Sequence, residues 1–572
     1  MASNEPGDRY RVFTIPPEEA RRIDEAEYLA RKPRLAALFV LVFLVGVGAL
    51  SLYALRPPAA LPSAAPLTEF SALRAIQHDY VIATEPHPAG SSANERVQAY
   101  IVSTMKSFGI EAEVVSSFYA EGSDAGRANL VLARIPGTAN TKAFALMAHY
   151  DSTPYGPGAA DDCSGVISLL EIAHVLKASP PLKNDVIFVF TDGEETGLLG
   201  ARAFVKHAWF NEVGVMTNLE ARGTQGNSLV FDTSEQNGWL IAEMIEAMRY
   251  PCASSLMYDI YKLMPFSSDF DVLRRHGMKG FDIAFIDNFA WYHTANDRPE
   301  HLSLATLQQH GSCGLDLARH FGNLPLDGVI TAPDTVYFNV FGYRLVRYPL
   351  GWSEPLAIGT TVLVCIVLLL GLIRRHISIG GVLAGIVVWP VVAALAAAVA
   401  VMIVALLWGP DTVMRLYTEN FTRIPDLTPL YHNTLYTTSY AAASIAVAAL
   451  IYGALSRWIR SQSLIVGAYA WWVAVLFVLN RLLPGGSFLA TWPLAFSALG
   501  MFVCFIFAKR GTLRPGWVVF LSIFTVPTLL LLTPMYQSFA STIMIAGAPG
   551  FAVLTVLAMG LLIPQLDLMG RV

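Results

Sequence analysis

The stretch Phe190-Thr-Asp-Gly-Glu-Glu-Thr-Gly-Leu-Leu-Gly200 holds the most informative pattern in this chain. It continues an apolar segment, 186–190, that is typical of a buried strand, and its Gly-Leu-Leu-Gly end can begin a helix. Two adjacent carboxylates, Glu194 and Glu195, therefore follow a buried strand directly. Two acids at such a position are unfavourable unless a cation or a shared proton compensates their charge. The alternative interpretation is a solvated acidic turn, which is the commoner reason for a Glu-Glu pair.

The chain from Thr68 to Leu326 alternates strand-like and helical segments. The predicted strands are 128–135, 143–148, 186–190, 213–219 and 281–286, and the predicted helices are 94–108, 166–176, 239–248 and 304–321. Strands that alternate with helices predict an α/β domain with a doubly wound, mostly parallel sheet and helices on both faces. The functional residues of such a sheet are expected at the carboxyl ends of its strands.

The composition shows that part of the chain lies in lipid. Of 572 residues, 54% are hydrophobic and only 15% are charged, which is far more apolar than an ordinary soluble protein. Residues 35–55 form an apolar run long enough to cross a bilayer, after a polar segment, 1–34, that ends in Arg31-Lys-Pro-Arg34. Because the run and its leader are both long, we predict a retained signal anchor rather than a cleaved signal peptide.

Seven further spans are predicted after Trp352. They lie near 355–373, 380–407, 441–455, 464–479, 488–508, 517–532 and 543–563. The loops after the first, third and fifth of them carry Arg374-Arg375, Arg457 with Arg460, and Lys509-Arg510 with Arg514. The positive-inside rule places these loops and both termini in the cytoplasm. We therefore expect about eight transmembrane helices, with the α/β domain periplasmic or extracellular in a bacterium, or lumenal in a eukaryotic organelle.

The predicted organisation has six parts. They are a cytoplasmic segment (1–34), the anchor (35–55), a Pro/Ala linker (56–67), the extracytoplasmic domain (68–326), an aromatic interfacial connector (327–352) and the multi-span domain (353–572). The formal net charge of −5 is small and no long basic run is present, so the lipid bilayer, and not nucleic acid, is the expected partner. The sequence leaves the oligomeric state open.

Other strand ends carry side chains that bind metals. The strand 143–148 leads to His149-Tyr-Asp151 and then to Asp161-Asp-Cys-Ser-Gly165, the strand 213–219 leads to Glu220, and 281–286 leads to Tyr292-His293. Histidine and carboxylate donors favour zinc at a catalytic site, and the five cysteines show no CxxC spacing. Each residue alone has a bland explanation, such as an N-cap for Asp-Asp, but such a series within about 150 residues favours one joint metal site.

These motifs resemble a known family. The order HYD, GAADDCSG, DGEETGLLGA, NLEARG and YHTAND is similar to the co-catalytic zinc aminopeptidases, a family that includes glutamate carboxypeptidase-like enzymes. The resemblance covers residues 70–325 and implies a zinc exopeptidase type of fold, two zinc ions per chain and a peptide substrate. The multi-helix half, joined through DTVYFNVFGYRLVRYP, resembles the membrane-bound subgroup of endoplasmic reticulum metallopeptidases and vacuolar membrane proteases.

The resemblance also implies a role for each matching residue. His149 and Glu220 would bind one zinc ion, Glu195 and His293 the other, and Asp161 would bridge the two. Asp151 would orient His149. Glu194 would be the general base that takes a proton from the attacking water and later delivers it to the leaving amine. Tyr292 would donate a hydrogen bond to the developing oxyanion. Many family members have Asp where this chain has Glu220, but Glu is usual in the carboxypeptidase-like and membrane-bound branches.

The sequence as a whole favours a membrane-anchored zinc exopeptidase, an aminopeptidase that acts on peptides outside the cytoplasm. One alternative is a glutaminyl-peptide cyclase, which shares the fold but uses a single zinc ion; the segments 161–165 and 194–200 favour the two-zinc peptidases. A second alternative is a non-catalytic, receptor-like membrane protein on a peptidase fold, but such relatives lose ligands and this chain keeps all five. The preferred substrate side chain, and whether the amino or the carboxyl end is recognised, stay open.

Overall fold

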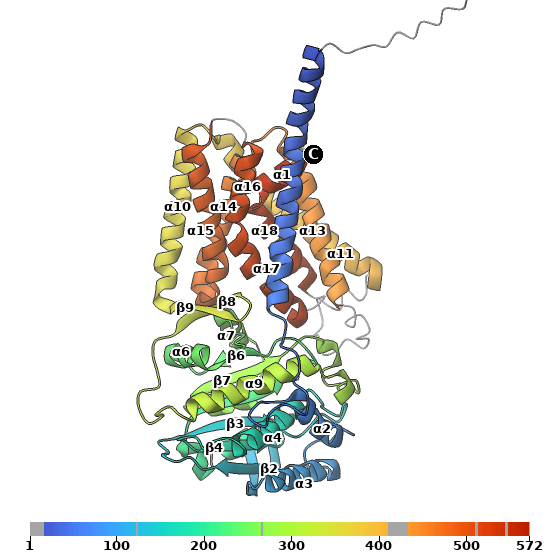
Figure 1. Ribbon diagram of the computed structural model, residues 1–572, viewed down its shortest axis with the longest axis vertical. Coiled ribbons are helices and arrows are strands. Elements are labelled where there is room, and N and C mark those ends of the chain that lie inside the picture. Colours follow the sequence, from blue (N-terminus) through green and yellow to red (C-terminus); the bar gives the residue numbers. More distant parts are fainter. Residues whose placement is uncertain are drawn as a thin grey trace, which may run out of the picture.

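The structure is a computed structural model that describes residues 17–121, 124–264, 267–409, 433–509, 513–543 and 547–570. It consists of an α/β domain and a bundle of apolar helices, with a β-hairpin between them (Figure 1). Of the predicted cytoplasmic segment 1–34, residues 1–16 lie outside the described part of the chain.

The α/β domain is built on a seven-stranded sheet with the order β1-β2-β4-β3-β5-β7-β6. The strands are β1 (Ala112–Glu121), β2 (Asp124–Ile135), β3 (Ala143–His149), β4 (Val186–Thr191), β5 (Val213–Ala221), β6 (Leu229–Thr233) and β7 (Gly280–Phe285). The central strands β4, β3, β5 and β7 run parallel, whereas β1, β2 and β6 pair antiparallel towards the edges. The sheet is therefore mixed, and the predicted parallel arrangement is confirmed for its centre.

Helices cover both faces of this sheet. They are α2 (Ala72–Ile82), α3 (Ser92–Ser107), α4 (Cys163–Lys177), α5 (Leu199–Phe204), α6 (Gly238–Ala247), α7 (Ser255–Tyr261), α8 (Asp269–Arg275) and α9 (Leu304–Phe321). Side chains of a strand alternate between its faces, so Leu146 packs into the cluster that holds α4 and α9, while Met147 packs into the cluster that holds α5 and α8. All residues of β3 and β4 are buried, as expected of strands covered on both faces.

The described part of the bundle contains six helices long and apolar enough to cross a membrane. They lie in α1 (Pro17–Ala54), α10 (Ser353–Ile373), α11 (Ile379–Trp408), α13 (Asn433–Leu455), α14 (Ser461–Leu482) and α15 (Phe488–Phe507). Two bent pairs would raise the number to eight: α16 (Pro515–Ile523) with α17 (Val526–Ile543), bent by 55°, and α18 (Ala548–Gly560) with α19 (Ile563–Gly570), bent by 81°. Each bend lies just before a proline, Pro527 or Pro564, which cannot continue an unbroken helix. The predicted number of about eight agrees with the higher count.

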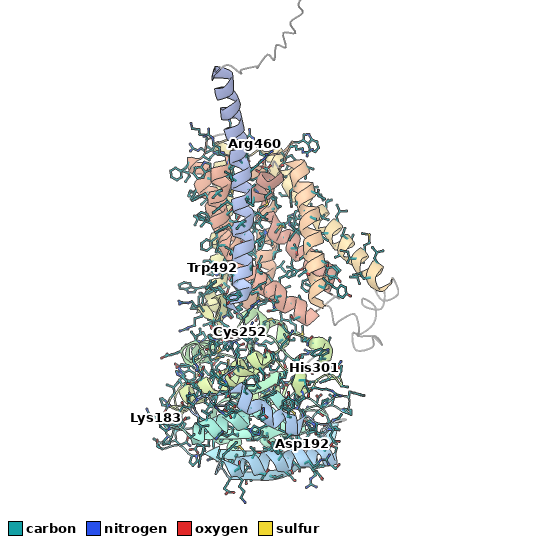
Figure 2. The ribbon with its side chains drawn as sticks, turned by 45° about the vertical axis from the view of Figure 1, so that its right-hand side comes forward. Lys183, Asp192, Cys252, His301, Arg460 and Trp492 are labelled. Carbon is teal, nitrogen blue, oxygen red and sulfur yellow. The ribbon has the colours of Figure 1, made fainter. Side chains whose placement is uncertain are left out.

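The two halves meet at the hairpin of β8 (Thr335–Phe341) and β9 (Arg344–Pro349). The ring of Phe338 stacks on Phe488 of α15, with 4.1 Å between the ring centroids. The Tyr343 hydroxyl donates a hydrogen bond of 2.7 Å to the carbonyl oxygen of Arg56, just after α1. The hairpin is part of one chain connection between the halves, and the other connection, which follows α1, runs beside it. Figure 2 labels Trp492 on the bundle side of this junction and Arg460 at the opposite end of the bundle.

Candidate active site

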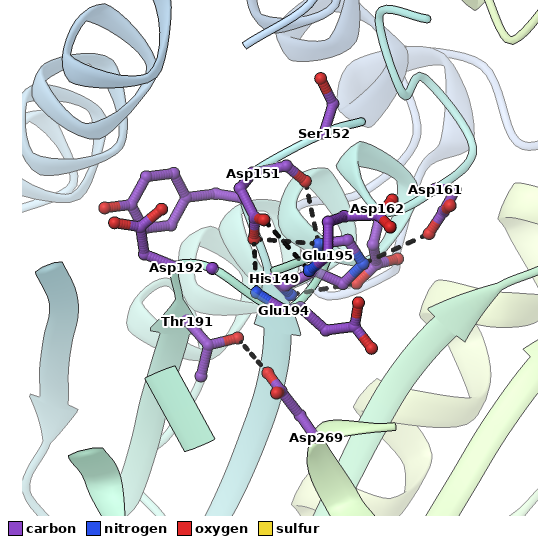
Figure 3. Close-up of polar contacts among 12 residues, drawn as sticks. His149, Asp151, Ser152, Asp161, Asp162, Thr191, Asp192, Glu194, Glu195 and Asp269 are labelled. Carbon is purple, nitrogen blue, oxygen red and sulfur yellow. Dashed lines mark hydrogen bonds and ion pairs between the residues drawn. The ribbon is translucent and has the colours of Figure 1, made fainter. Parts of the chain in front are cut away.

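The carboxyl ends of the central strands bring the predicted site residues together. Figure 3 shows His149, Asp151, Asp161, Glu194 and Glu195 among them. His149 is the last residue of β3, Glu194 and Glu195 follow β4, Glu220 lies near the end of β5, Asp161 lies just before α4, and His293 lies in the loop after β7. Segments that are as much as 144 positions apart, such as His149 and His293, thus meet at one edge of the sheet because neighbouring parallel strands end there.

Asp161 lies between two sets of donor atoms. Its Oδ1 is 3.2 Å from His149 Nε2, and its Oδ2 is 3.0 Å from His293 Nε2. On one side, His149 Nε2 lies 3.6 Å from Glu220 Oε1; on the other, His293 Nε2 lies 3.1 Å from Glu195 Oε1. Each oxygen of one buried carboxylate therefore faces its own histidine, and each histidine lies near its own glutamate.

The donor atoms of the site fit metal ions. Within the described chain, Asp161 Oδ2, Glu195 Oε1 and His293 Nε2 are buried atoms that make no hydrogen bond. Buried polar atoms without a partner are costly, and a metal ion bound between them would satisfy all three. Histidine nitrogens and carboxylate oxygens, with no thiolate among them, are the donors of catalytic zinc sites.

Asp162 is a second candidate donor, because one oxygen of its carboxylate lies within 4.8 Å of donor atoms of His149 and Glu220. Its carboxylate already has two partners, however: Oδ1 accepts from the backbone N–H of Gly165 at 3.1 Å, and Oδ2 accepts from that of His149 at 3.2 Å. The first of these bonds caps α4. These contacts place Asp162 at the start of the helix, and Asp161 stays the predicted metal donor of the two.

Asp151 contacts both His149 and the Glu-Glu pair. Nδ1 of His149 lies 2.9 Å from the backbone carbonyl oxygen of Asp151 and 3.4 Å from its Oδ1. The Asp151 carboxylate accepts the backbone N–H groups of Glu194 at 3.0 Å and of Glu195 at 3.2 Å. The residue thus fixes the His149 ring largely through its backbone, and its side chain fixes the turn that carries both glutamates.

Asp297 is a site residue that the sequence interpretation left without a role. Its carboxylate accepts the backbone N–H groups of Ala160 at 2.7 Å and of Asp161 at 3.2 Å, and so holds the loop that presents Asp161. The sequence could have indicated a role for this residue, because Asp297 is the last residue of the YHTAND motif that contains His293. Because each of its two oxygens accepts a backbone N–H group, this buried aspartate positions the loop.

Burial and crowding of acids dominate the electrostatics of the site. Burial raises the pKa of Glu195 to about 7, with a further contribution from Asp161, against the opposing effect of His293. Burial likewise raises the pKa of Glu194 well above its usual range. Burial disfavours the charged form of His293, but its contacts with Asp161 and Glu195 outweigh this and raise its pKa to about 10. A cation bound among these groups would oppose the shifts of the two carboxylates, because it favours their charged forms.

A cavity of about 330 Å³ opens beside the donor atoms. Asp161, Glu194, Glu220, Arg222 and Tyr292 line its polar end, and Leu229, Phe231, Met257, Ile260, Tyr261, Met264 and Ile286 line most of the rest. The ring of Tyr292 stacks on that of His293, with 3.7 Å between the centroids. The apolar lining was not predicted, since scattered apolar residues carry no sequence signal that separates them from the core.

The comparisons with known proteins define the class of this domain. Residues 130–318, which lie within the α/β domain, match the model of Peptidase family M28. It is 31% identical over 280 residues to "Vacuolar membrane protease" of Candida dubliniensis, covering 46% of this chain and 29% of that protein. It is 31% identical over 229 residues to "Endoplasmic reticulum metallopeptidase 1" of Mus musculus, covering 39% and 26%. The chain thus matches less than a third of the length of these curated relatives.

Solved structures similar to the domain include an aminopeptidase from Aneurinibacillus sp. strain AM-1 and a glutaminyl cyclase from Porphyromonas gingivalis. The first has a TM-score of 0.36 and 13% sequence identity, over 44% of this chain and 95% of that one. The second has a TM-score of 0.37 and 21% identity, over 44% and 98%.

Proposed function

We propose that this chain is a membrane-anchored, zinc-dependent exopeptidase that removes residues from the amino ends of peptides outside the cytoplasm. The observation that carries the proposal is the position of Asp161, whose two oxygens face two different histidines, each of which lies near its own glutamate. A carboxylate shared between two such sets suits a pair of metal ions better than a single one. In this assignment His149 and Glu220 would hold one zinc ion, Glu195 and His293 would hold the other, and Asp161 would contribute to both.

Zinc in such a site supplies Lewis-acid chemistry: it polarises a carbonyl group and lowers the pKa of water. The residues of the chain supply the proton transfers and the positioning. Glu194 lines the cavity beside the donor atoms, and its turn is fixed by Asp151. Its carboxylate takes a proton from the attacking water and then delivers that proton to the nitrogen of the leaving amine.

Tyr292 is placed to stabilise the charge that develops on the scissile carbonyl oxygen. It lines the cavity together with Glu194 and Asp161, and its ring is held against the ring of His293. Burial and the nearby acids Asp161 and Glu195 raise the pKa of its hydroxyl, so the group stays protonated and can donate a hydrogen bond.

Two features support the amino end of a peptide as the substrate and the outer side of the membrane as the location. Glu194, the carboxylate at the polar end of the cavity that binds no zinc ion in this assignment, would attract a cationic amine. Arg460, in the loop after α13, lies at the end of the bundle away from the α/β domain (Figure 2), and it donates a hydrogen bond of 2.8 Å to the carbonyl oxygen of Arg375, after α10. The positive-inside rule then assigns the α/β domain to the non-cytoplasmic side.

The test uses the purified full-length protein and a peptide library with free or blocked ends, with and without a chelator. We expect chelator-sensitive shortening from the amino end, and two zinc ions per chain by elemental analysis. Shortening from the carboxyl end would overturn the proposed specificity. One tightly bound zinc ion per chain, together with cyclisation of amino-terminal glutamine, would identify a glutaminyl-peptide cyclase instead.

A further inference from the structure

Helix α7 separates the substrate cavity from the helical bundle. Met257, Ile260 and Tyr261 of α7, with Met264 in the turn that follows, line the cavity. These positions are spaced by three and four residues and so share one face of the helix. The other face, with Ser255 and Asp259, is directed at the loop between α14 and α15. The wall of the cavity therefore rests on the membrane-spanning half.

The loop 484–486 is held by α7 through both polar groups of Gly485. The backbone N–H of Gly485 donates to Asp259 Oδ2 at 2.7 Å. Its carbonyl oxygen accepts from the Ser255 hydroxyl at 2.6 Å, and this hydroxyl in turn accepts from the backbone N–H of Tyr337 at 3.0 Å. The three segments are thereby joined, since one serine links α7, the loop and strand β8.

The approach of the loop to α7 requires glycine. A Cβ atom at Gly485 would lie 2.7 Å from the carbonyl oxygen of Ser255 and 2.8 Å from Asp259 Oδ2. One at Gly486 would lie 2.3 Å from Leu256 Cδ1. Real Cβ atoms do not come this close to backbone atoms. A side chain at Gly485 would therefore displace α7 from its present position, and with it the wall of the cavity.

The wall is only one side chain thick. Leu229 and Met257 line the substrate cavity on one side and a smaller cavity of about 50 Å³ on the other. The smaller cavity is bounded by residues of the bundle that include Phe488, Leu531 and Met535. Because there is open volume behind Met257, the position of this side chain depends on how the bundle holds α7.

We propose that the loop 484–486 of the membrane-spanning half determines substrate specificity, by holding α7 where the cavity accepts a bulky apolar side chain on the first residue of the peptide. This inference rests on the proposed function and specifies its substrate class. The cavity of about 330 Å³ has an apolar part, lined by α7 with Leu229, Phe231 and Ile286, that a leucine or phenylalanine side chain would fill better than alanine. Asp259 is a positioning residue in this scheme, because it acts on the substrate only through α7.

The experiment compares kcat and KM of the full-length protein for phenylalanine, leucine and alanine p-nitroanilides. Asp259→Ala removes the acceptor for the backbone N–H of Gly485. We expect the KM for the two bulky substrates to rise by about 10-fold or more. The kcat for all substrates and the KM for the alanine substrate should stay within about threefold of the wild-type values. Asp259→Asn keeps an acceptor oxygen and should retain the wild-type selectivity. Gly485→Ala should act like Asp259→Ala, and Gly359→Ala in α10, whose Cβ would meet no atom within 4 Å, is its matched control.

The outcomes separate this inference from the proposed function. An unchanged ratio of phenylalanine to alanine kcat/KM in Asp259→Ala, at wild-type zinc content and melting temperature, would overturn it. Gly485→Ala can fail to fold, so Asp259→Ala, which only removes atoms, is the deciding variant. If the wild type cleaves none of the substrates, the proposed function fails. The inference is then tested by the binding of L-phenylalaninol and L-alaninol. Asp259→Ala should lose the preference for L-phenylalaninol, and an intact preference would contradict the inference.

Discussion

The α/β domain and the helical bundle bury very different polar groups. At the strand ends, His149, Asp161 and Asp269 are among many acids and histidines that are almost completely buried. In the described part of the bundle from 353 onward, the buried polar side chains are serines, threonines and glutamines, apart from His376 and Asp567. Several of the hydroxyls, such as Thr491 and Ser522, donate to the carbonyl oxygen four residues earlier in their own helix.

This difference shows how the two halves divide the work. A hydroxyl bonded within its own helix can lie in an apolar environment at little cost, so it serves packing. A cluster of buried acids with unsatisfied oxygens is costly and persists where a ligand compensates it. We therefore expect the chemistry in the α/β domain, and expect the bundle to act through the shape that it gives to its neighbour.

The largest effect is expected for Glu194→Gln. The substitution keeps the volume of the side chain but removes the proton acceptor, so kcat should fall by about 10²–10⁴-fold while zinc content is unchanged. Steady-state kinetics and elemental analysis measure both, with Glu235→Gln on the exposed surface as the control. Wild-type turnover in the Glu194 variant would remove this residue from the mechanism. It would also contradict the expectation that these buried acids of the α/β domain carry out the chemistry.

A smaller effect is expected for Asp151→Asn. An amide can accept only one of the two backbone N–H groups that the carboxylate binds, and its NH₂ group would face the other. The turn that carries Glu194 and Glu195 should loosen, and zinc affinity should fall by about 10–100-fold. Competition with a zinc-binding dye measures the affinity, and an unchanged value would show that the turn is fixed by other contacts.

The third prediction concerns the stability of the α/β domain in acid. Burial lowers the pKa of His310 to about 3, and its Nδ1 lies 2.7 Å from the Ser228 hydroxyl. The folded state holds this histidine neutral, whereas the unfolded chain protonates it below about pH 6.5. Its contribution is therefore present above pH 6.5 and is lost as the pH falls towards 3. Between pH 7.5 and 5.5 the free energy of unfolding should drop by about 1.4 kcal/mol more than in His310→Asn. Denaturation of both proteins at the two pH values measures this, and equal drops would contradict it.

The smallest effect is expected in the bundle, for Tyr469→Phe. The hydroxyls of Tyr469 in α14 and Ser497 in α15 lie 2.8 Å apart in the buried interior. Removing one hydroxyl should cost about 0.6 kcal/mol, the average for such bonds between membrane helices, and should leave kcat/KM and zinc content unchanged. Thermal unfolding and kinetics test this, and a strong loss of activity without unfolding would mean that the bundle takes part in the chemistry.

The centre of the fold could be predicted from the sequence, and its edges could not. Strands β3 and β4 are buried on both faces, so each is a continuous apolar run that is easily recognised. Strand β1 lies at the edge, and exposed side chains such as Val114 and Phe118 alternate with partly buried ones among polar residues. Its pairing with β2, and not its own composition, makes it a strand.

The donor residues were predictable because they follow recognisable strands in chain order, and their meeting at one edge follows from a parallel sheet. The wall of the cavity was not predictable. Helix α7 has only seven residues, and it is held in place by a hydrogen bond between Ser255 and Gly485, 230 positions apart. No local pattern in the sequence reports a contact of that length.

The hydrogen bond between Tyr343 and the backbone after α1 gives the α/β domain two neighbouring points of attachment. A domain on one flexible tether tumbles through many orientations, but two tethers joined at their base resist rotation. The mouth of the cavity then keeps a constant position relative to the helical bundle. A peptide free in solution can reach it from any distance, whereas the end of a chain anchored in the same membrane can reach it only if its stalk spans the distance from the membrane to the cavity. In the proposed function, the junction would therefore set the length that a membrane-anchored peptide needs to reach the site.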